Sequence, residues 1–94
     1  MKVELSEQVV EFVRQLPPEP RRVLRRALRD LARERGDIKA LEGPLDGYSR
    51  LRVGAYRVVL SYSKRRTIQC VFAERRSIVY ELLVELLESR LTSR

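Results

Sequence analysis

The segment Arg50-Leu51-Arg52-Val53-Gly54-Ala55-Tyr56-Arg57-Val58-Val59-Leu60 predicts a β-hairpin. Glycine at the first central position of a two-residue turn suits the type II′ geometry that joins twisted strands. A turn at Gly54-Ala55 places Arg52 directly across from Arg57. Because side chains alternate between the faces of a sheet, Arg50, Arg52 and Arg57 share one face and point outward. The opposite face takes the apolar members of the segment, which are Leu51, Val53, Tyr56, Val58 and Leu60.

Two arginines directly opposite each other on neighbouring strands destabilise a sheet. We therefore expect this face to bind something anionic. The net charge is +7 over 94 residues, and residues 17–36 and 37–73 each carry seven basic residues against three acidic ones. A cationic middle of the chain favours an anionic partner such as nucleic acid. A solvated, arginine-rich surface is the alternative interpretation.

Composition narrows the chemistry further. Histidine is absent, which excludes histidine acid–base pairs and Ser-His-Asp triads, and no acidic cluster has metal-ligand spacing, so we expect neither a metal nor a cofactor. A single cysteine, Cys70, fits a reducing compartment and a buried position in a strand. Met1 to Glu7 lacks the apolar segment of a secretory signal, and no apolar run approaches a membrane span. These features predict a cytoplasmic protein without membrane contact.

Apolar spacing predicts one domain with elements along the whole chain. We expect a strand over residues 2–5, helices over 7–16 and 19–35, a loop over 37–48, and strands over 49–53, 56–62 and 67–73. Gly36 suits the position that ends the second helix. In the last strand Ile68, Cys70 and Phe72 alternate and should share one face. From Ser77 onward the pattern is helical again.

The predicted second helix carries a stripe of arginines at steps of three and four residues. Its candidate contacts to phosphate are Arg22, Arg26 and Arg29. A solvated helix face is the equal alternative. The C-terminal helix is apolar around most of its circumference, so it either packs on the sheet or forms a surface for a partner.

Three segments together resemble the RelE/ParE superfamily of toxins from toxin–antitoxin modules. They are Leu41-Glu42-Gly43, the run from Tyr48 to Val58, and Glu74-Arg75-Arg76-Ser77-Ile78-Val79-Tyr80. The resemblance covers nearly the whole chain. It implies an α+β, RelE-like fold: an antiparallel twisted sheet with two N-terminal helices on one face and a C-terminal helix.

The resemblance also implies roles for individual residues. RelE-like toxins cut mRNA in the ribosomal A site without a metal, and the RNA 2′-OH is the nucleophile. By position, Arg57 resembles the arginine that stabilises the scissile phosphate, while Arg50 and Arg52 resemble the basic pair on the preceding strand. Tyr80 resembles the C-terminal tyrosine of the RelE branch, and Arg76 resembles the arginine one helical turn before it. With histidine absent, Tyr80 is the candidate for acid–base work, because nearby cations favour the phenolate; a core or helix-cap tyrosine is the alternative interpretation.

One position departs from the RelE pattern. RelE-type enzymes carry an arginine where this chain has Glu74; the neighbouring Arg75 is a candidate replacement, although its side chain starts in a different direction. Two alternatives to an mRNA endonuclease therefore stay open, which are a ParE-like inhibitor of DNA gyrase and a catalytically weak protein with the toxin fold. The expected partners are a cognate antitoxin together with the ribosome and mRNA, or with gyrase.

Overall fold

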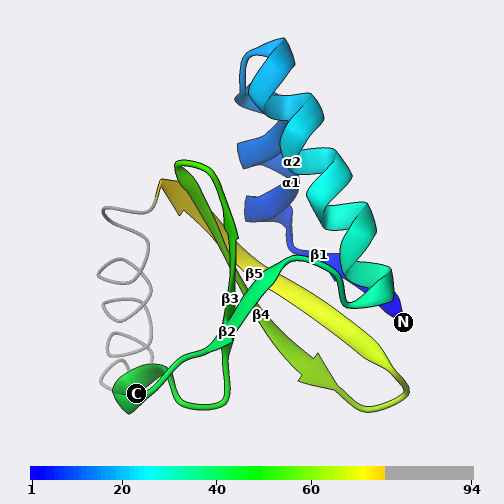
Figure 1. The fold of residues 1–94 in the computed structure, drawn as a ribbon, viewed down its shortest axis with the longest axis vertical. Helices are drawn as coiled ribbons and strands as arrows, with labels where there is room; N and C mark the ends of the chain where they lie inside the picture. Colours follow the sequence, from blue (N-terminus) through cyan, green and yellow to red (C-terminus); the bar gives the residue numbers. More distant parts are fainter. Residues whose placement is uncertain (76–94) are drawn as a thin grey trace.

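The computed structural model describes residues 1–75 of the chain. The predicted C-terminal helix, with Arg76 and Tyr80, lies outside the described residues. Figure 1 shows the elements in order: β1 (Lys2–Leu5), α1 (Glu7–Gln15), α2 (Pro18–Asp30), the short 3-10 helix η1 (Leu31–Arg33), β2 (Asp37–Ala40), the 3-10 helix η2 (Gly43–Leu45), β3 (Ser49–Val53), β4 (Tyr56–Ser63) and β5 (Thr67–Arg75). No helix of this described part is long and apolar enough to cross a membrane.

The strands form one sheet in the order β1-β5-β4-β3-β2. The pairs β2–β3, β3–β4 and β4–β5 are antiparallel, as expected. The expectation of a wholly antiparallel sheet is wrong for β1, which pairs with β5 in parallel. A parallel pair needs a long connection, and the two helices and three strands between β1 and β5 provide one. The result is a mixed sheet within an α+β fold.

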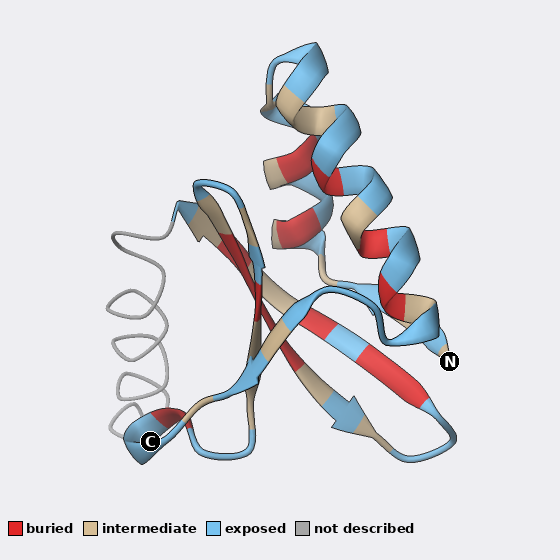
Figure 2. Cartoon of the chain, viewed as in Figure 1, coloured by how far each residue is buried: buried red, intermediate tan, exposed pale blue. Residues whose placement is uncertain are grey.

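Both helices contribute to the main core, which lies on one face of the sheet. Ser6 caps α1 by accepting a hydrogen bond from the Val9 amide, and proline in the first turn suits the start of α2. The core unites Val9, Val13, Leu24, Leu28 and Leu31 of the helical segments with Leu51, Val58, Leu60, Ile68, Cys70 and Ala73 of the sheet. Figure 2 shows these buried positions on the central strands and the inner sides of the helices.

The opposite face of the sheet carries a smaller apolar cluster around Val59 and Leu45, and Phe72 packs against it. This placement corrects the expectation that Phe72 shares a face with Ile68 and Cys70. The register shifts where Val59 pairs with Phe72 and Leu60 pairs with Cys70. Val71 is therefore an extra residue in β5, and a β-bulge of this kind reverses the alternation beyond it. Ala73 faces the helices instead.

The segment around Gly36 differs from the sequence prediction in two ways. Glu34, not Gly36, takes the left-handed conformation after the helical segment, with φ 53. The Arg35 amide donates to the Asp30 carbonyl and the Glu34 amide to the Leu31 carbonyl, which together form a Schellman ending. Gly36 is needed for a different reason: at φ 134, an added Cβ would lie 2.7 Å from Leu51 Cδ1.

The predicted loop over residues 37–48 is in fact partly ordered into an edge strand. Asp37–Ala40 forms β2 and pairs with β3, with Asp37 opposite Arg52 and Lys39 opposite Arg50. The alternation of polar Asp37, apolar Ile38 and polar Lys39 is typical of a strand. The Gly-Pro and Asp-Gly pairs that follow it indicate a loop, and the sequence prediction followed them.

Side chains of α1 and its cap extend the pairing along β5 after β1 ends. Ser6 Oγ donates to the Val71 carbonyl at 3.0 Å. The Gln8 side-chain amide donates to the Ala73 carbonyl at 2.6 Å, and its oxygen accepts from the Ala73 amide at 2.7 Å. Gln8 thus makes the two bonds that another strand residue would make, and it satisfies backbone groups that burial would otherwise leave unpaired.

Candidate functional site

The hairpin of β3 and β4 places its arginines as the sequence predicted. Arg52 pairs with Arg57 across the two strands, and Val53 pairs with Tyr56 next to the turn. Gly54 has φ 57, which is the positive value that a type II′ turn requires at its first central residue. Because Leu51 and Val58 belong to the core under the helices, Arg50, Arg52 and Arg57 lie on the opposite face. We call this surface the arginine face.

Arg57 is on the predicted face, but its side chain is not exposed as expected: it is 7% accessible. Its Nη1 donates to the Gly54 carbonyl at 3.0 Å and to the Tyr56 carbonyl at 2.9 Å. The guanidinium is therefore held against its own turn in a defined orientation. These two bonds use Nη1, whereas an arginine also carries donors on Nε and Nη2.

Arg50 is held by the edge strand. Its Nη1 lies 3.2 Å from the Asp37 carboxylate and donates to the Asp37 carbonyl at 2.8 Å. The Arg50 side chain is 15% exposed, so this ion pair is partly shielded from water. The Asp37 carboxylate therefore offsets part of the positive charge of Arg50, which we had expected to bind phosphate. Of the three arginines of this face, Arg52 is the exposed one.

A row of four charged residues crosses the sheet at this level. Asp37 pairs with Arg52, Arg52 with Arg57, and Arg57 with Glu74 on four neighbouring strands. We call it the charged row. Residues paired directly across strands lie on the same face, so two carboxylates flank the two adjacent arginines. Each carboxylate also has a partner outside the row: Asp37 pairs with Arg50 at 3.2 Å, and Glu74 Oε1 accepts a hydrogen bond from the Arg75 amide at 3.0 Å.

Arg75 does not join this row. It pairs with Tyr56, and its guanidinium lies over the Tyr56 ring at 5.8 Å from the ring centre. The same ring packs edge to face on Phe12 of α1, with the ring centres 5.7 Å apart. Arg75 is therefore on the helix side of the sheet, and it does not take the place of an arginine at position 74.

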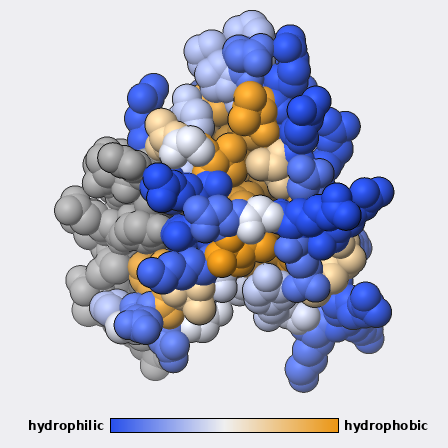
Figure 3. All heavy atoms as spheres, in the orientation of Figure 1, coloured by the Kyte–Doolittle hydropathy of each residue, from blue (hydrophilic) through white to orange (hydrophobic). Residues whose placement is uncertain are grey.

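The arginines of α2 are also separate from the arginine face. Leu24 and Leu28 pack α2 on the core side of the sheet, so Arg22, Arg26 and Arg29 lie on the other side of the molecule. Arg22 Nη1 pairs with the Glu19 carboxylate at 2.9 Å on the same helix. Figure 3 shows hydrophilic side chains along the outer side of α2 and apolar surface in the angle between the helices and the sheet.

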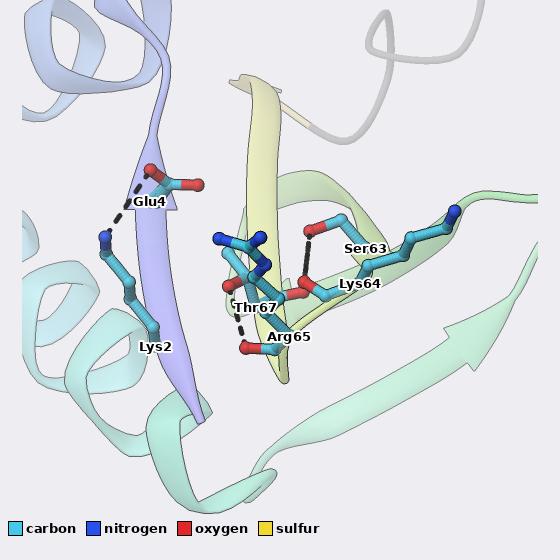
Figure 4. Close-up of polar contacts among 6 residues, drawn as sticks. All are labelled: Lys2, Glu4, Ser63, Lys64, Arg65 and Thr67. Atoms are coloured by element: carbon cyan, nitrogen blue, oxygen red, sulfur yellow. Dashed lines mark hydrogen bonds and ion pairs between the residues drawn. The ribbon is translucent and has the colours of Figure 1, made fainter.

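A second cationic feature is the turn that joins β4 to β5. Arg65 and Arg66 both adopt left-handed conformations, with φ 65 and 53. Thr67 Oγ1 donates to the Arg65 carbonyl at 3.2 Å, and Ser63 Oγ donates to the Lys64 carbonyl at 3.4 Å, as Figure 4 shows. Ser63 Oγ also lies within hydrogen-bond distance of the Thr67 carbonyl, at 3.3 Å. This basic turn is at the far end of β4 from Arg57. The run Lys64-Arg65-Arg66 was its signal in the sequence.

Among residues 1–75, two side chains have clearly shifted pKa values, and both lie away from the arginine face. Burial raises the pKa of the Cys70 thiol to about 12. Burial also raises the pKa of Tyr62, and the nearby Glu34 carboxylate adds to that effect. Within residues 1–75, no group of three or more His, Cys, Asp or Glu side chains is arranged to hold a metal ion.

Several solved structures share this fold. A chain of the archaeal RelE–RelB complex from Pyrococcus horikoshii OT3 is 30% identical over 80% of this chain and 93% of that chain, with a TM-score of 0.62. A chain of the RelBE2 toxin–antitoxin complex from Mycobacterium tuberculosis is 26% identical over 81% of this chain and 91% of that chain, with a TM-score of 0.66. The YoeB/ParE toxin from Agrobacterium tumefaciens, at 18% identity over 81% and 99%, has a TM-score of 0.67. The sequence matches no protein-family model and no curated protein.

Proposed function

Because this chain belongs to the RelE/ParE superfamily of toxins from type II toxin–antitoxin modules, we propose that it is a ribosome-dependent mRNA endonuclease. Its cognate antitoxin is the partner that holds it inactive, since the similar structures from Pyrococcus horikoshii and Mycobacterium tuberculosis are toxin–antitoxin complexes. The ribosome presents the mRNA, and no metal or cofactor takes part.

The adjacency of Arg52 and Arg57 on the arginine face carries this proposal. Arginine binds phosphate through paired N–H donors, and two neighbouring guanidinium groups match the charge that grows on a phosphate under attack. Donors that are already oriented before the reaction contribute most to such stabilisation. Arg57 meets this condition because the Gly54 and Tyr56 carbonyls fix its guanidinium.

The proposed reaction is a transesterification within the RNA. The 2′-oxygen attacks the adjacent phosphorus, the bond from phosphorus to the 5′-oxygen breaks, and the products are a 2′,3′-cyclic phosphate and a 5′-hydroxyl. A base takes the 2′-OH proton and an acid protonates the leaving 5′-oxygen. Arg57 and Arg52 stabilise the phosphate, and Arg50 orients the strand beside it. Tyr80 for proton transfer and Arg76 as a further cation are assigned by resemblance alone.

Glu74 favours the second candidate, inhibition of DNA gyrase. It stands directly across from Arg57, where a RelE-type enzyme carries an arginine, and a carboxylate there opposes the approach of a phosphate. ParE-like toxins do not depend on this set of cations. The carboxylates of Asp37 and Glu74 at the two ends of the charged row are also what we would expect of a catalytically weak endonuclease.

Induction of the toxin in bacterial cells, with mRNA 5′ ends and DNA breaks measured together, separates the candidates. The endonuclease produces new mRNA 5′ ends within translated frames, and these cuts disappear when translation initiation is blocked. Gyrase inhibition produces DNA breaks and an SOS response while mRNA stays intact. Growth arrest with neither signal would contradict both activities.

A further inference from the structure

The basic turn between β4 and β5 consists of Lys64, Arg65 and Arg66, and the proposed reaction does not use it. All three side chains are exposed. Within residues 1–75, none of them forms an ion pair. Figure 4 shows the Lys64 side chain extending away from the sheet. Three adjacent cations without counter-charges repel one another, so the turn is suited to an anionic partner.

The backbone of the basic turn favours other residue types. Arg65 and Arg66 are both left-handed, with φ 65 and 53, and turns of this kind favour asparagine and glycine. The surrounding bonds hold the turn in place, since Thr67 Oγ1 donates to the Arg65 carbonyl and the Lys2 amide donates to the Arg66 carbonyl at 2.9 Å. Strain that is maintained in this way is typical of functional positions. We infer that the arginine side chains compensate for it by making a contact.

An exposed aromatic side chain lies next to the basic turn. Tyr62 is 47% exposed, and it pairs with Ile68 of the core, so it is on the helix side of the sheet. The ring of an exposed tyrosine is a surface on which a nucleobase stacks, while neighbouring cations contact the phosphates. The Glu34 carboxylate is also near, where it adds to the effect of burial on the pKa of Tyr62. One carboxylate against three cations still leaves an excess of positive charge.

RNA fits this combination better than an acidic protein segment does. An acidic helix binds through several apolar anchors set in a groove, whereas the side chains here are one planar ring and three cations on a turn. Figure 1 shows the turn projecting from the sheet at the end opposite the β3–β4 turn. An unpaired RNA strand offers both a base for the ring and phosphates for the cations.

The basic turn is well separated from the arginine face. Arg57 is near the start of β4 and Lys64 follows its end, and extended chain of this length spans about 20 Å. Tyr62 is on the helix side of the sheet, whereas Arg57 is on the other face. A base stacked on Tyr62 is therefore not a neighbour of the phosphate at Arg57, and the two sites contact different RNA segments. On a ribosome, the second segment is ribosomal RNA.

We propose that Tyr62 and the basic turn form a docking site for an unpaired segment of ribosomal RNA, with a base on the Tyr62 ring and phosphates on the three cations. This rests on the proposed function in naming the ribosome as the source of the RNA. The docking site acts in binding and not in chemistry. Its loss should raise the KM for ribosomes and leave kcat unchanged.

The strained turn allows variants that separate RNA binding from folding. Arg65→Asn combined with Arg66→Gly removes two charges and relieves the strain, whereas Arg65→Lys combined with Arg66→Lys keeps both charges. Arg25→Gln combined with Arg26→Gln is the control for charge, since these arginines of α2 are equally exposed. Tyr62→Leu removes the planar ring but keeps an apolar side chain, and Tyr62→Phe keeps the ring. The probe is purified ribosomes, with and without mRNA, titrated with labelled toxin over a range of salt concentrations.

The asparagine–glycine variant should unfold at a higher temperature than wild type and yet bind ribosomes about tenfold or more weakly. Its salt dependence should also decrease, by about one unit in the slope of log Kd against log salt. Tyr62→Leu should weaken binding about fivefold or more. Tyr62→Phe, the double lysine variant and the α2 control should stay within about twofold of wild type. Wild-type binding should not require mRNA.

Chemical probing of ribosomal RNA identifies the partner. Wild-type toxin should protect an unpaired base that Tyr62→Leu leaves reactive. Absence of such a base, binding that requires mRNA, equal losses for the turn and the α2 control, or unchanged binding of Tyr62→Leu would each overturn the docking site. An asparagine–glycine variant less stable than wild type would overturn the argument from strain.

Cleavage kinetics separate this inference from the proposed function. Turn variants that raise KM at constant kcat support both. Ribosome binding that follows the turn and Tyr62 variants in a toxin that never cleaves mRNA supports the docking site and removes the endonuclease. Wild-type KM in every variant of a toxin that does cleave removes the docking site alone. No binding of wild-type toxin to ribosomes removes both.

Discussion

Arg57 is the residue on which the proposed chemistry depends most. It combines burial with two fixed hydrogen bonds to its own turn, so its guanidinium is oriented before any substrate arrives. Lysine at this position keeps the positive charge but lacks the fork of donors that arginine presents to phosphate. A lysine substitution at position 57 therefore tests whether the positive charge alone is sufficient or whether the donor geometry of arginine is required.

We expect Arg57→Lys to reduce ribosome-dependent mRNA cleavage by about 10²–10³-fold, the usual effect of removing one oriented donor. Cleavage is measured by mapping mRNA 5′ ends in a translation extract, with thermal unfolding recorded in parallel. Arg50→Lys is the control, since its main contacts are to Asp37 and its loss should be smaller. Equal effects at the two positions would contradict a special role for Arg57.

Glu74 offers a second test at the residue scale. It faces Arg57 across β4 and β5, so Glu74→Arg would place three arginines side by side in the charged row. We expect the variant to be less stable by about 0.2–1 kcal/mol, as is usual for unfavourable pairs across strands. The deficit should shrink in high salt, which screens charges.

The same variant should cleave mRNA faster if the toxin is a RelE-like endonuclease. Glu74→Gln is the matched control, because it removes the carboxylate without adding a cation. Denaturant unfolding at low and high salt measures stability, and the translation extract measures cleavage. A Glu74→Arg variant that is as stable as wild type at low salt would show that Glu74 does not offset Arg57.

Cys70 is predicted to make stability depend on alkaline pH. Burial raises the pKa of its thiol from 9.0 to about 12, so the folded state holds the proton more tightly than the unfolded state. The stability from this group is fully present below about pH 9 and is lost as pH rises toward 12. Unfolding free energy should fall less steeply over this range in Cys70→Ala than in wild type.

Thiol labelling checks the same assignment independently. Only the thiolate reacts readily, so native protein near neutral pH should label far more slowly than protein in denaturant. Rapid labelling of the native state would show that Cys70 is not held in the core.

At the scale of elements, the edge of β5 is completed by a helix. β1 ends at Leu5, and the Gln8 amide then pairs with both backbone groups of Ala73. The bulge at Val71 lies in the stretch bridged by Ser6 and Gln8. The start of α1 therefore depends on side-chain contacts with the sheet as well as on its apolar face.

Gln8→Ala should lower the free energy of unfolding by about 1–3 kcal/mol, because it leaves a buried donor and a buried acceptor without partners. Gln15→Ala is the control on the same helix: its amide bonds to Glu11 in an exposed position, so we expect little change. Denaturant unfolding measures both. Similar small losses at the two positions would mean that water replaces the Gln8 amide.

At the scale of the whole molecule, the sheet separates two cationic surfaces. The helices cover one face through the main core, and the arginine face lies on the other. Net charge alone suggested that all these arginines could serve one nucleic-acid site. The topology instead places the arginines of α2 and those of the hairpin on opposite faces of the sheet.

We therefore expect Arg26→Ala to leave mRNA cleavage unchanged, whereas Arg52→Ala lowers it substantially and reduces its dependence on salt. Both variants remove one exposed positive charge, so total charge is matched. The measurement is the cleavage rate on ribosomes over a range of salt concentrations. Equal losses for the two variants would indicate that overall charge, and not the arginine face, drives binding to the ribosome.

Local patterns in the sequence were sufficient for much of this fold. The hairpin register followed from a glycine turn and period-two alternation, and both helices followed from apolar spacing. The family followed from three short segments and agrees with the similarity to the archaeal RelE chain. These features depend on neighbours within a few residues, so the sequence alone determined the arginine face and its candidate residues.

Tertiary structure decided those features that depend on contacts between residues far apart in the sequence. The parallel pairing of β1 joins opposite ends of the described chain, and no local pattern specifies it. The burial of Arg57, the Asp37–Arg50 pair and the position of Glu74 opposite Arg57 arise when four strands align. The bulge at Val71 moved Phe72 to the other face because one unpaired residue reverses the alternation. Separation of the arginines of α2 from the arginine face likewise exists only once the helices pack on the sheet.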